Sequence, residues 1–154
     1  MTETAVQVLA PCPGRLLAMA DLPDPVFAGE MVGPGVGIEP EPHDTTVVSP
    51  IGGKVVKMLP HAFVVLGSAG VGVLVHLGIN TVRLDGQGFD VLGKQGSTVA
   101  AGDPMVRWNP ATITDEDMTT HVIVVAMDRP KGSVAAPHDG AVASLGDVLF
   151  TVEP

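Results

Sequence analysis

Short runs of alternating apolar and polar residues, separated by turn residues, dominate this chain. Runs of this kind that are rich in Val, Ile and Thr predict β-strands. Clear examples lie at residues 46–49, 122–126 and 148–152. Helix is expected only as one or two short turns, one within residues 109–118, where Thr114-x-x-Asp117 forms a capping pattern, and one within residues 88–96. The pattern therefore predicts an all-β fold, an antiparallel β-sandwich.

Two kinds of turn recur along the chain. Pro-x-x-Gly occurs at Pro11–Gly14, Pro50–Gly53 and Pro137–Gly140, and each copy leads into an apolar strand. Gly followed by an acidic residue occurs at Gly29-Glu30, Gly102-Asp103 and Gly146-Asp147. In such turns Pro fixes φ at the entry, and Gly permits a positive φ or a close backbone approach. The turns resemble those of barrel-sandwich hybrids, the architecture of biotinyl and lipoyl carriers. A carrier role is not expected, because no lysine lies in a Met-Lys-Met or Asp-Lys-Ala setting.

Composition narrows the class of protein. With 154 residues, of which 45% are hydrophobic and 3% aromatic, the chain can form one domain (1–154) with a substantial core. Its net charge of -9 repels phosphate backbones and anionic lipid, so binding to nucleic acid or to a membrane surface is not expected. The lone Cys12 cannot form an internal disulfide, and the start of the chain shows no export signal. We therefore expect a cytoplasmic protein.

Residues 61–76 form an apolar hairpin with a histidine at each end. If Ser68 and Ala69 form its tip, His61 and His76 are direct cross-strand neighbours, with Cβ atoms about 4.5–5.5 Å apart. A loop of odd length would instead shift the register and turn the two histidines to opposite faces. The sequence thus predicts a histidine pair, on the condition that the loop is even.

The even loop also assigns the two faces of this hairpin. One face carries the histidines together with Phe63, Val65, Gly72 and Leu74, and the other carries a core stripe of Ala62, Val64, Val71, Val73 and Val75. The histidines then lie in a shallow apolar patch. An apolar patch with a convergent polar pair is typical of a docking site with chemistry at its centre.

Paired imidazoles serve three kinds of chemistry. A zinc site needs a third ligand, and none of His43, His121 and His138 has a recognisable ligand spacing. Hydrolysis needs an activated nucleophile, and no Gly-x-Ser-x-Gly or Cys/His signature is present. In the third kind, one imidazole accepts a phosphoryl group while its neighbour donates a hydrogen bond to the phosphoryl oxygens. This chemistry needs no metal and suits an open patch that a partner protein covers.

At these residues the sequence resembles a known family, the enzyme IIA domain of the glucose class of the bacterial phosphoenolpyruvate-dependent sugar phosphotransferase system. The most characteristic piece is Val75-His-Leu-Gly-Ile-Asn-Thr-Val82. Further matching pieces lie, in order, at residues 10–11, 21–28, 31–38, 50–55, 61–63, 86–89, 96–99 and 102–103. The resemblance covers nearly the whole chain.

The resemblance implies a role for each histidine. His76 matches the phosphorylated histidine, which accepts a phosphoryl group on Nε2 from the phosphocarrier HPr and passes it to a cysteine of the enzyme IIB domain of a sugar permease. His61 matches the second active-site histidine, which orients and stabilises the phosphoryl group. The backbone carbonyl of Gly78 would accept the Nδ1 hydrogen of His76 and fix its tautomer. No cofactor is implied, apart from adventitious zinc at His61 and His76, and contact with the membrane would occur only through the permease.

The resemblance also implies a docking ring for partner proteins. This ring is expected to consist of Asp24, Val26, Phe27, Phe63 and Leu74, with Asn80 at its edge. The family usually has Asp where this chain has Asn80, so one charge for partner pairing is absent. A threonine hydroxyl of the family's active-site network is missing as well, because Leu59-Pro60 leads directly into His61.

The sequence leaves two alternative functions to consider. One is a zinc peptidase of the LytM type, which has a related β architecture and a site with paired histidines. That class needs a His-x-His motif near the C-terminus, and neither His121 nor His138 lies in one. The other is a regulatory binding protein, in which phosphorylation of His76 selects the target proteins that dock.

Overall fold

The computed structural model describes residues 5–130, 132–134 and 140–153. Its strands are β1 (Val6–Leu9), β2 (Gly14–Ala18), β3 (Gly35–Pro40), β4 (Thr45–Val48), β5 (Gly53–Leu59), β6 (Ala62–Leu66), β7 (Gly72–Ile79), β8 (Phe89–Val91), β9 (Thr98–Val99), β10 (Pro104–Trp108), β11 (Thr119–Ala126), β12 (Val142–Ala143) and β13 (Val148–Val152). Its helical segments are η1 (Met19–Asp21), α1 (Pro25–Ala28), η2 (Ser68–Gly70), η3 (Thr81–Leu84) and η4 (Pro110–Thr112).

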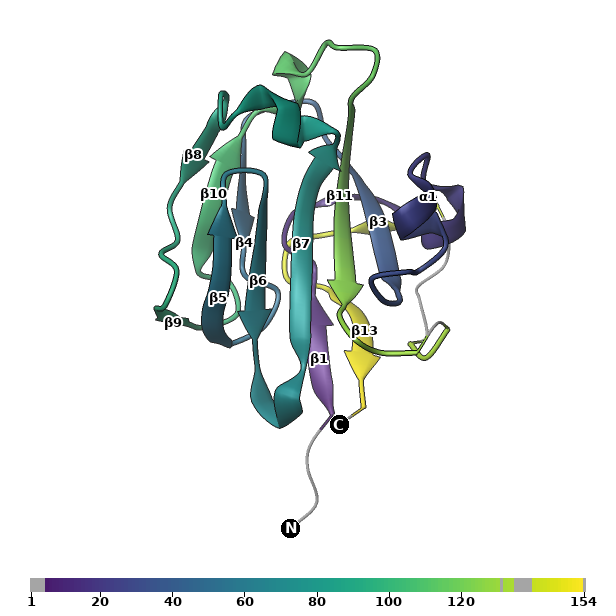
Figure 1. Cartoon of the computed structure of the whole chain (residues 1–154), viewed down its shortest axis with the longest axis vertical. Helices are drawn as coiled ribbons and strands as arrows, with labels where there is room; N and C mark the ends of the chain where they lie inside the picture. Colours follow the sequence, from purple (N-terminus) through teal and green to yellow (C-terminus); the bar gives the residue numbers. More distant parts are fainter. Residues whose placement is uncertain (1–4, 131, 135–139, 154) are drawn as a thin grey trace.

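The strands pair only in antiparallel fashion within the described residues. An eight-stranded sheet has the order β12-β2-β3-β11-β7-β6-β5-β9, beside a three-stranded sheet β4-β10-β8 and the pair β1-β13. Figure 1 shows β5, β6 and β7 of the large sheet in front of β4, with β10 and β8 beside them. The predicted all-β sandwich is confirmed.

The main core lies between these sheets. Alternate residues of β6 and β7 enter it, so Phe63, Val75 and Leu77 are fully buried. On the opposite side of the core, Trp108 of β10 stacks on Phe89 of β8, with ring centroids 5.6 Å apart. Because the alternation of a strand sends every second side chain inward, the remaining side chains of β6 and β7 form the outer face of the large sheet.

The recurring turns create closely packed strand junctions. A Cβ atom at Gly14 would lie 2.3 Å from the carbonyl oxygen of Glu39, and one at Gly53 would lie 2.2 Å from that of Leu66. These two Pro-x-x-Gly turns therefore require glycine for close backbone approach. The third copy, at Pro137–Gly140, lies largely outside the described residues.

Two of the three Gly-acid turns have the same structure. The Asp103 carboxylate accepts a hydrogen bond from the Ala100 amide at 2.9 Å, and the Asp147 carboxylate accepts one from the Ser144 amide at 2.8 Å. The pair Gly29-Glu30 differs, because Gly29 ends helix α1.

The large sheet consists of two halves that resemble each other across β7 and β11. Its strand order reads the same from either edge if β12, β2, β3 and β11 are matched with β9, β5, β6 and β7. Two hydrogen bonds follow the same correspondence. The Leu9 amide donates to the Pro50 carbonyl and the Val48 amide donates to the Pro11 carbonyl, both at 2.9 Å, so Leu9 corresponds to Val48 and Pro11 to Pro50. The halves therefore differ chiefly in the segments that join equivalent strands.

That difference determines which part of the outer face is covered. Residues 19–34 join β2 to β3, and their Met19, Leu22 and Phe27 pack on Ile123 and Val125 of β11 in a second apolar cluster. Residues 60–61 alone join β5 to β6, so this connection contributes no equivalent cover to the outer face of its half. In Figure 1, helix α1 of the covering segment lies on the β3 side of the sheet.

The helical turns differ from the sequence prediction. Residues 88–96 contain strand β8 rather than a helical turn, because Phe89 pairs with Trp108 of β10 and is buried against it. Residues 109–118 do contain one turn, η4, but Asn109 caps it through a bond from the Ala111 amide, and Thr114 does not. Helix α1 was not predicted, although Asp24-Pro25 is a recognisable cap and first-turn pair.

Within the described ranges, no helix has the length and apolar character needed to cross a membrane.

Candidate functional site

The hairpin that carries the two histidines has an odd loop, contrary to the predicted even one. Ala62 pairs with His76, and Leu66 pairs with Gly72. Residues 67–71 form the loop, in which Ala69 and Gly70 both have positive φ and the Gly67 amide donates to the Val71 carbonyl at 2.8 Å. The bond between Gly67 and Val71 encloses a three-residue turn, residues 68–70. Gly70 was the sequence signal for this odd turn, because three-residue hairpin turns commonly end on a left-handed residue.

The histidines nevertheless meet. The predicted direct pairing of His61 with His76 is wrong, since the Leu77 amide donates to the His61 carbonyl at 2.7 Å. His61 lies in the two-residue connection before β6, where the alternation of a strand does not fix the direction of a side chain. Its ring lies 5.2 Å from that of His76, centroid to centroid, at an interplanar angle of 77°.

His76 is held in one orientation by its own strand. Its Nδ1 lies 2.6 Å from the carbonyl oxygen of Gly78. A carbonyl can only accept a hydrogen bond, so Nδ1 carries the proton and Nε2 of the neutral ring is free of it. Gly78 has φ 79°, and a Cβ atom there would lie 2.6 Å from the Thr119 carbonyl oxygen, so this position requires glycine.

Burial keeps both imidazoles neutral. It lowers the pKa of His76 and of His61 below the ordinary value of 6.5. For His76, the hydrogen bond to Gly78 opposes that shift, the neighbouring His61 adds to it, and the charge of Asp24 opposes it. Nε2 of His76 therefore presents a lone pair at neutral pH, as a nucleophile or a ligand must.

Helix α1 positions two further groups at His76. The Asp24 carboxylate caps α1 by accepting the Val26 amide at 2.8 Å, which fixes its charge close enough to influence His76. The ring of Phe27 lies 5.2 Å from that of His76, centroid to centroid, and only 9% of the Phe27 residue is exposed. Phe27 was predicted in the docking ring for partner proteins, but its side chain mainly packs against the imidazole of His76.

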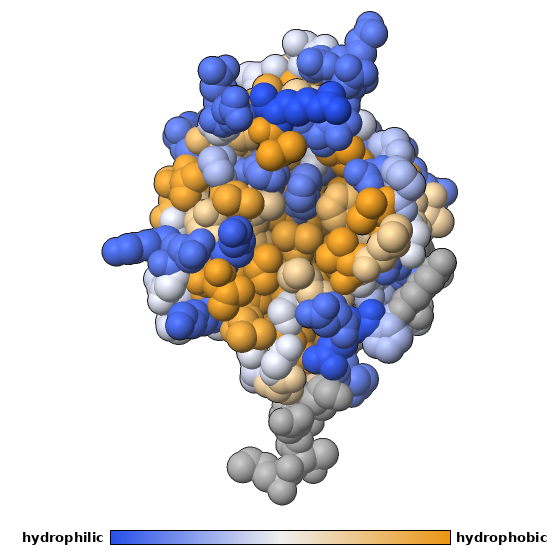
Figure 2. Space-filling view, viewed as in Figure 1, coloured by the Kyte–Doolittle hydropathy of each residue, from blue (hydrophilic) through white to orange (hydrophobic). Residues whose placement is uncertain are grey.

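The outer face of β6 and β7 forms an apolar patch beside the histidines. We call it the outer patch, and it consists of Ala62, Val64, Leu66, Gly72 and Leu74, which share a face with His76. Figure 2 shows apolar surface in the centre of this face, with polar side chains around it. The patch is partly exposed, from Ala62 at 5% to Leu66 at 42%, and the short β5–β6 connection adds no cover to it.

The odd loop exchanges the two faces of β6 relative to the prediction. Phe63 is 0% exposed and belongs to the main core together with Val65, so it cannot line a docking surface. Ala62 and Val64, predicted as core, lie on the outer face instead, where Ala62 is nevertheless buried at 5% exposed and Val64 is half-buried. On β7 the prediction holds, because Leu74 and His76 face outward while Val73 and Val75 are buried.

The other predicted docking residues take different positions. Val26, next to Phe27 in α1, is 43% exposed. Asn80 is exposed at the end of β7 with φ 66°, and its side-chain amide donates to the Asp117 carbonyl at 2.7 Å. Asn80 therefore links the end of β7 to the loop before β11, and it lacks the charge of the Asp that is usual in the family.

Sequence reasoning missed one buried polar residue beside this site. Thr81 is 1% exposed, and its hydroxyl donates to the Leu77 carbonyl at 2.6 Å. The signal was its place in the segment Val75–Val82, where a buried hydroxyl must find an acceptor.

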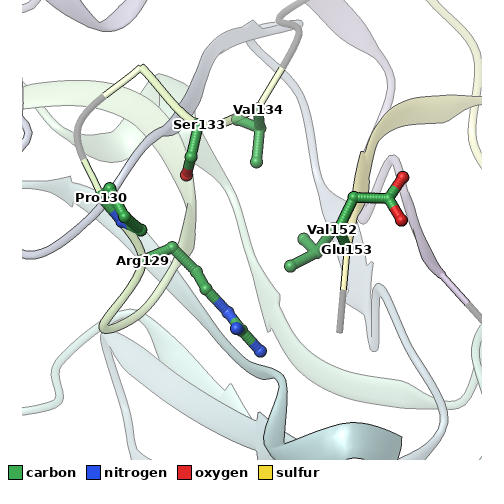
Figure 3. A pocket seen from close by; sticks show the side chains of 6 residues that line it. All are labelled: Arg129, Pro130, Ser133, Val134, Val152 and Glu153. Carbon is green, nitrogen blue, oxygen red and sulfur yellow. The ribbon is translucent and has the colours of Figure 1, made fainter. Parts of the chain in front are cut away.

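The histidines lie half-buried at the surface, beside the outer patch. Neither of them lines the cavities that the structure describes next to residues 14–42, 18–35 and 129–153. One, of about 210 Å³, lies between the chain after β11 and the end of β13, where Arg129 and Glu153 contribute side chains (Figure 3). Across residues 5–130, 132–134 and 140–153, no three His, Cys, Asp or Glu side chains gather as a metal site would require.

The chain is similar to characterised proteins over most of its length. The glucose-specific EIIA component of Staphylococcus aureus strain COL is 45% identical over 106 residues, which are 68% of this chain and 63% of that protein. The component of the same name from Staphylococcus epidermidis RP62A is 39% identical over 132 residues, 76% of this chain and 78% of that protein. The match thus spans less than two thirds of the S. aureus relative.

A solved structure and a family model agree with these relatives. The glucose permease IIA of Mycoplasma capricolum superposes with a TM-score of 0.83 at 30% identity, covering 97% of this chain and 96% of that one. The family model described as phosphoenolpyruvate-dependent sugar phosphotransferase system, EIIA 1, matches residues 6–132. A resemblance first carried by Val75–Val82 therefore extends to the whole fold, and the chain belongs to the EIIA 1 family of the phosphoenolpyruvate-dependent sugar phosphotransferase system.

Proposed function

We propose that this protein is a phosphoryl carrier of a sugar phosphotransferase system, with residues 1–154 as one enzyme IIA domain and His76 as the residue that carries the group. The observation that supports this most strongly is the bond from Nδ1 of His76 to the Gly78 carbonyl. It leaves Nε2 unprotonated beside an open apolar patch, where a protein donor can reach it.

The proposed transfer consists of two displacements at phosphorus. In the first, the lone pair of Nε2 attacks the phosphoryl group of the phosphohistidine of HPr. The donor's P–N bond breaks, and its imidazole leaves with that electron pair. In the second, a cysteine thiolate of an enzyme IIB domain attacks phosphorus, the bond to Nε2 breaks, and Nε2 of His76 recovers its lone pair. Neither step requires a metal or a cofactor.

The hydrogen bond to Gly78 assists both displacements. While phosphorus occupies Nε2, the proton on Nδ1 keeps the ring in a cationic form, which is a better leaving group than a neutral phosphoimidazole. The Gly78 carbonyl and the Asp24 charge both favour that cation, and both oppose the lowering of the His76 pKa. Burial thus favours the neutral imidazole that accepts the phosphoryl group, and Gly78 and Asp24 favour the cationic phosphoimidazole that releases it.

His61 is proposed to steady the phosphoryl group. Its ring lies 5.2 Å from that of His76, centroid to centroid, and comes from the short connection that borders the outer patch. From there an imidazole N–H can donate to a phosphoryl oxygen bound at Nε2. Such a donor contributes most where charge develops during transfer.

The outer patch is proposed as the surface on which HPr and the enzyme IIB domain dock in turn. Val64 and Leu74 would form its centre, Val26 its border, and Asp24 an acidic contact. The net charge of -9 supports partners with basic docking surfaces. We place this exchange in the cytoplasm, where a permease would present its IIB domain, and target proteins that sense phosphorylation of His76 could use the same patch. A zinc peptidase of the LytM type is not favoured by the relatives.

Replacement of the histidines tests the assignment of roles. With phosphoenolpyruvate, enzyme I and HPr, the unaltered protein should acquire an acid-labile phosphate, and His76→Ala should acquire none. His61→Ala should still be labelled but should pass the group to a IIB domain about 100-fold more slowly, because a hydrogen bond to the transferring group is lost. Rapid-quench labelling measures both rates.

The matched control for these variants is His121→Ala, because His121 is also a half-buried histidine of the large sheet and its Nδ1 lies near the Thr119 hydroxyl. It should transfer at the unaltered rate. Labelling of His76→Ala at the unaltered rate would refute the proposal.

Titration of the histidines tests the claim that Nε2 is neutral at physiological pH. Because burial lowers the pKa of His76, its NMR signals should titrate with a midpoint below 6.5. The exposed His43 is an internal control, since the Asp44 carbonyl and then the Glu41 carboxylate raise its pKa above 6.5. Acceptance of phosphoryl should therefore stay constant as pH falls from 8 to about 6.5 and decline only below that. A His76 midpoint above that of His43 would contradict the site's electrostatics.

A charge in the outer patch tests docking separately from chemistry. Val64→Asp should fold, because Val64 faces outward and is half-buried, and should lower the rate constant for transfer from HPr at low HPr concentration about tenfold or more. Val142→Asp is the control, since Val142 is 78% exposed and lies on β12 at the edge of the sheet. Equal rates for the two variants would show that partners dock elsewhere.

A further inference from the structure

The turn that follows His76 closes through a side chain. Leu77 to Thr81 link the end of β7 to η3, and the Thr81 hydroxyl donates to the Leu77 carbonyl at 2.6 Å. Thr81 is 1% exposed. Among the described residues only Ser49 is a similarly buried polar residue, and it lies in the separate connection between β4 and β5. A buried hydroxyl in this turn is therefore a specific feature of the site.

Thr81 also contacts the residue whose carbonyl holds the imidazole. A Cβ atom at Gly78 would lie 2.5 Å from Cγ2 of Thr81 and 3.3 Å from its Oγ1. The Thr81 side chain thus occupies the space directly beside the Gly78 Cα atom. Its hydroxyl fixes the carbonyl one residue before Gly78, and its methyl group packs on Gly78 itself.

The orientation of the Gly78 peptide needs such support. Gly78 has φ 79° and Asn80 has φ 66°, and glycine at the first of these positions can adopt many other conformations. If the Gly78 carbonyl turned away, Nδ1 of His76 would lose its acceptor. Without that acceptor the proton is free to move to Nε2, and a protonated Nε2 has no lone pair with which to attack phosphorus.

We propose that Thr81 is a positioning residue for phosphoryl transfer: by bonding the Leu77 carbonyl and packing on Gly78, it holds the Gly78 carbonyl on Nδ1 of His76 and so maintains the nucleophilic tautomer. In this role Thr81 acts through Leu77 and Gly78. The inference rests on the proposed role of His76 as the phosphoryl acceptor.

The test replaces Thr81 by valine, which keeps the shape of the side chain and removes the hydroxyl. In Thr81→Val, the Leu77 carbonyl loses its bond from Thr81 and the turn loosens. Nitrogen-15 NMR of the unphosphorylated protein should then show a mixture of His76 tautomers, whereas the unaltered protein should show Nδ1–H alone. The rate of phosphoryl acceptance should fall about tenfold, the lower end of the range for groups that orient a metal-bound imidazole.

Two variants separate positioning from general stability. Thr81→Ser keeps the hydroxyl and should retain the single tautomer and most of the rate. Ser49→Ala removes the other buried hydroxyl, which donates to the Ile51 carbonyl at 2.7 Å, and should lower stability without mixing the tautomers of His76. The NMR measurement requires that Thr81→Val be folded, which its amide spectrum reports directly.

The NMR and rate measurements can fail for Thr81 without failing for the carrier role of His76. If the unaltered protein accepts phosphoryl on His76 while Thr81→Val keeps the Nδ1–H tautomer and the full rate, the positioning role is wrong and the carrier role stands. If Thr81→Val unfolds, Thr81→Ser decides, because it keeps the hydroxyl bond to Leu77 and loses only the methyl group: loss of the single tautomer in that variant would show that the hydroxyl bond does not hold it and would overturn the role given to the hydroxyl. If His76 of the unaltered protein is never phosphorylated, the carrier role itself fails.

Discussion

One hydrogen bond, from Nδ1 of His76 to the carbonyl of Gly78, determines what this site can do. It decides which ring nitrogen holds the proton, and therefore which one can act as a nucleophile. The acceptor is the carbonyl of Gly78, which has φ 79° near the end of β7, at a position where a Cβ atom would lie 2.6 Å from the Thr119 carbonyl oxygen. The backbone at the end of β7 thus serves as the partner that a carboxylate supplies in other activated histidines.

The surroundings of His76 result from two unequal connections in a sheet whose halves are otherwise alike. The segment of residues 19–34 lies across one half and brings Phe27 and Asp24 to the imidazole, where Phe27 packs on the ring and Asp24 supplies charge. The two-residue connection at 60–61 carries His61 and leaves Val64 and Leu74 only partly buried on the outer face, although Leu74 also packs against the apolar cluster of the long segment. The proposed nucleophile His76, its proposed helper His61 and the proposed docking patch therefore share one face, because one connection is long and the other short.

Much of the fold and part of the candidate site could be predicted from the sequence, because turn residues and period-two patterns are local signals. The strands near 46–49, 122–126 and 148–152 follow from such signals, whereas the meeting of the two histidines and the Gly78 acceptor follow from the family resemblance. The register of the histidine hairpin does not follow, since a loop one residue longer exchanges Phe63 with Val64 between core and surface. The histidines still meet because His61 lies in a turn, and the proposed role of Thr81 depends on a bond that only the folded turn reveals.

We propose that the backbone makes Nε2 of His76 the phosphoryl acceptor. The position of the phosphate in the phosphorylated protein tests this proposal, and it can be obtained from phosphorus–nitrogen couplings in a sample labelled with nitrogen-15 in histidine. We expect phosphorus bonded to Nε2 of His76, with Nδ1 still protonated. Phosphorus bonded to Nδ1 of His76, or to either nitrogen of His61, would contradict it.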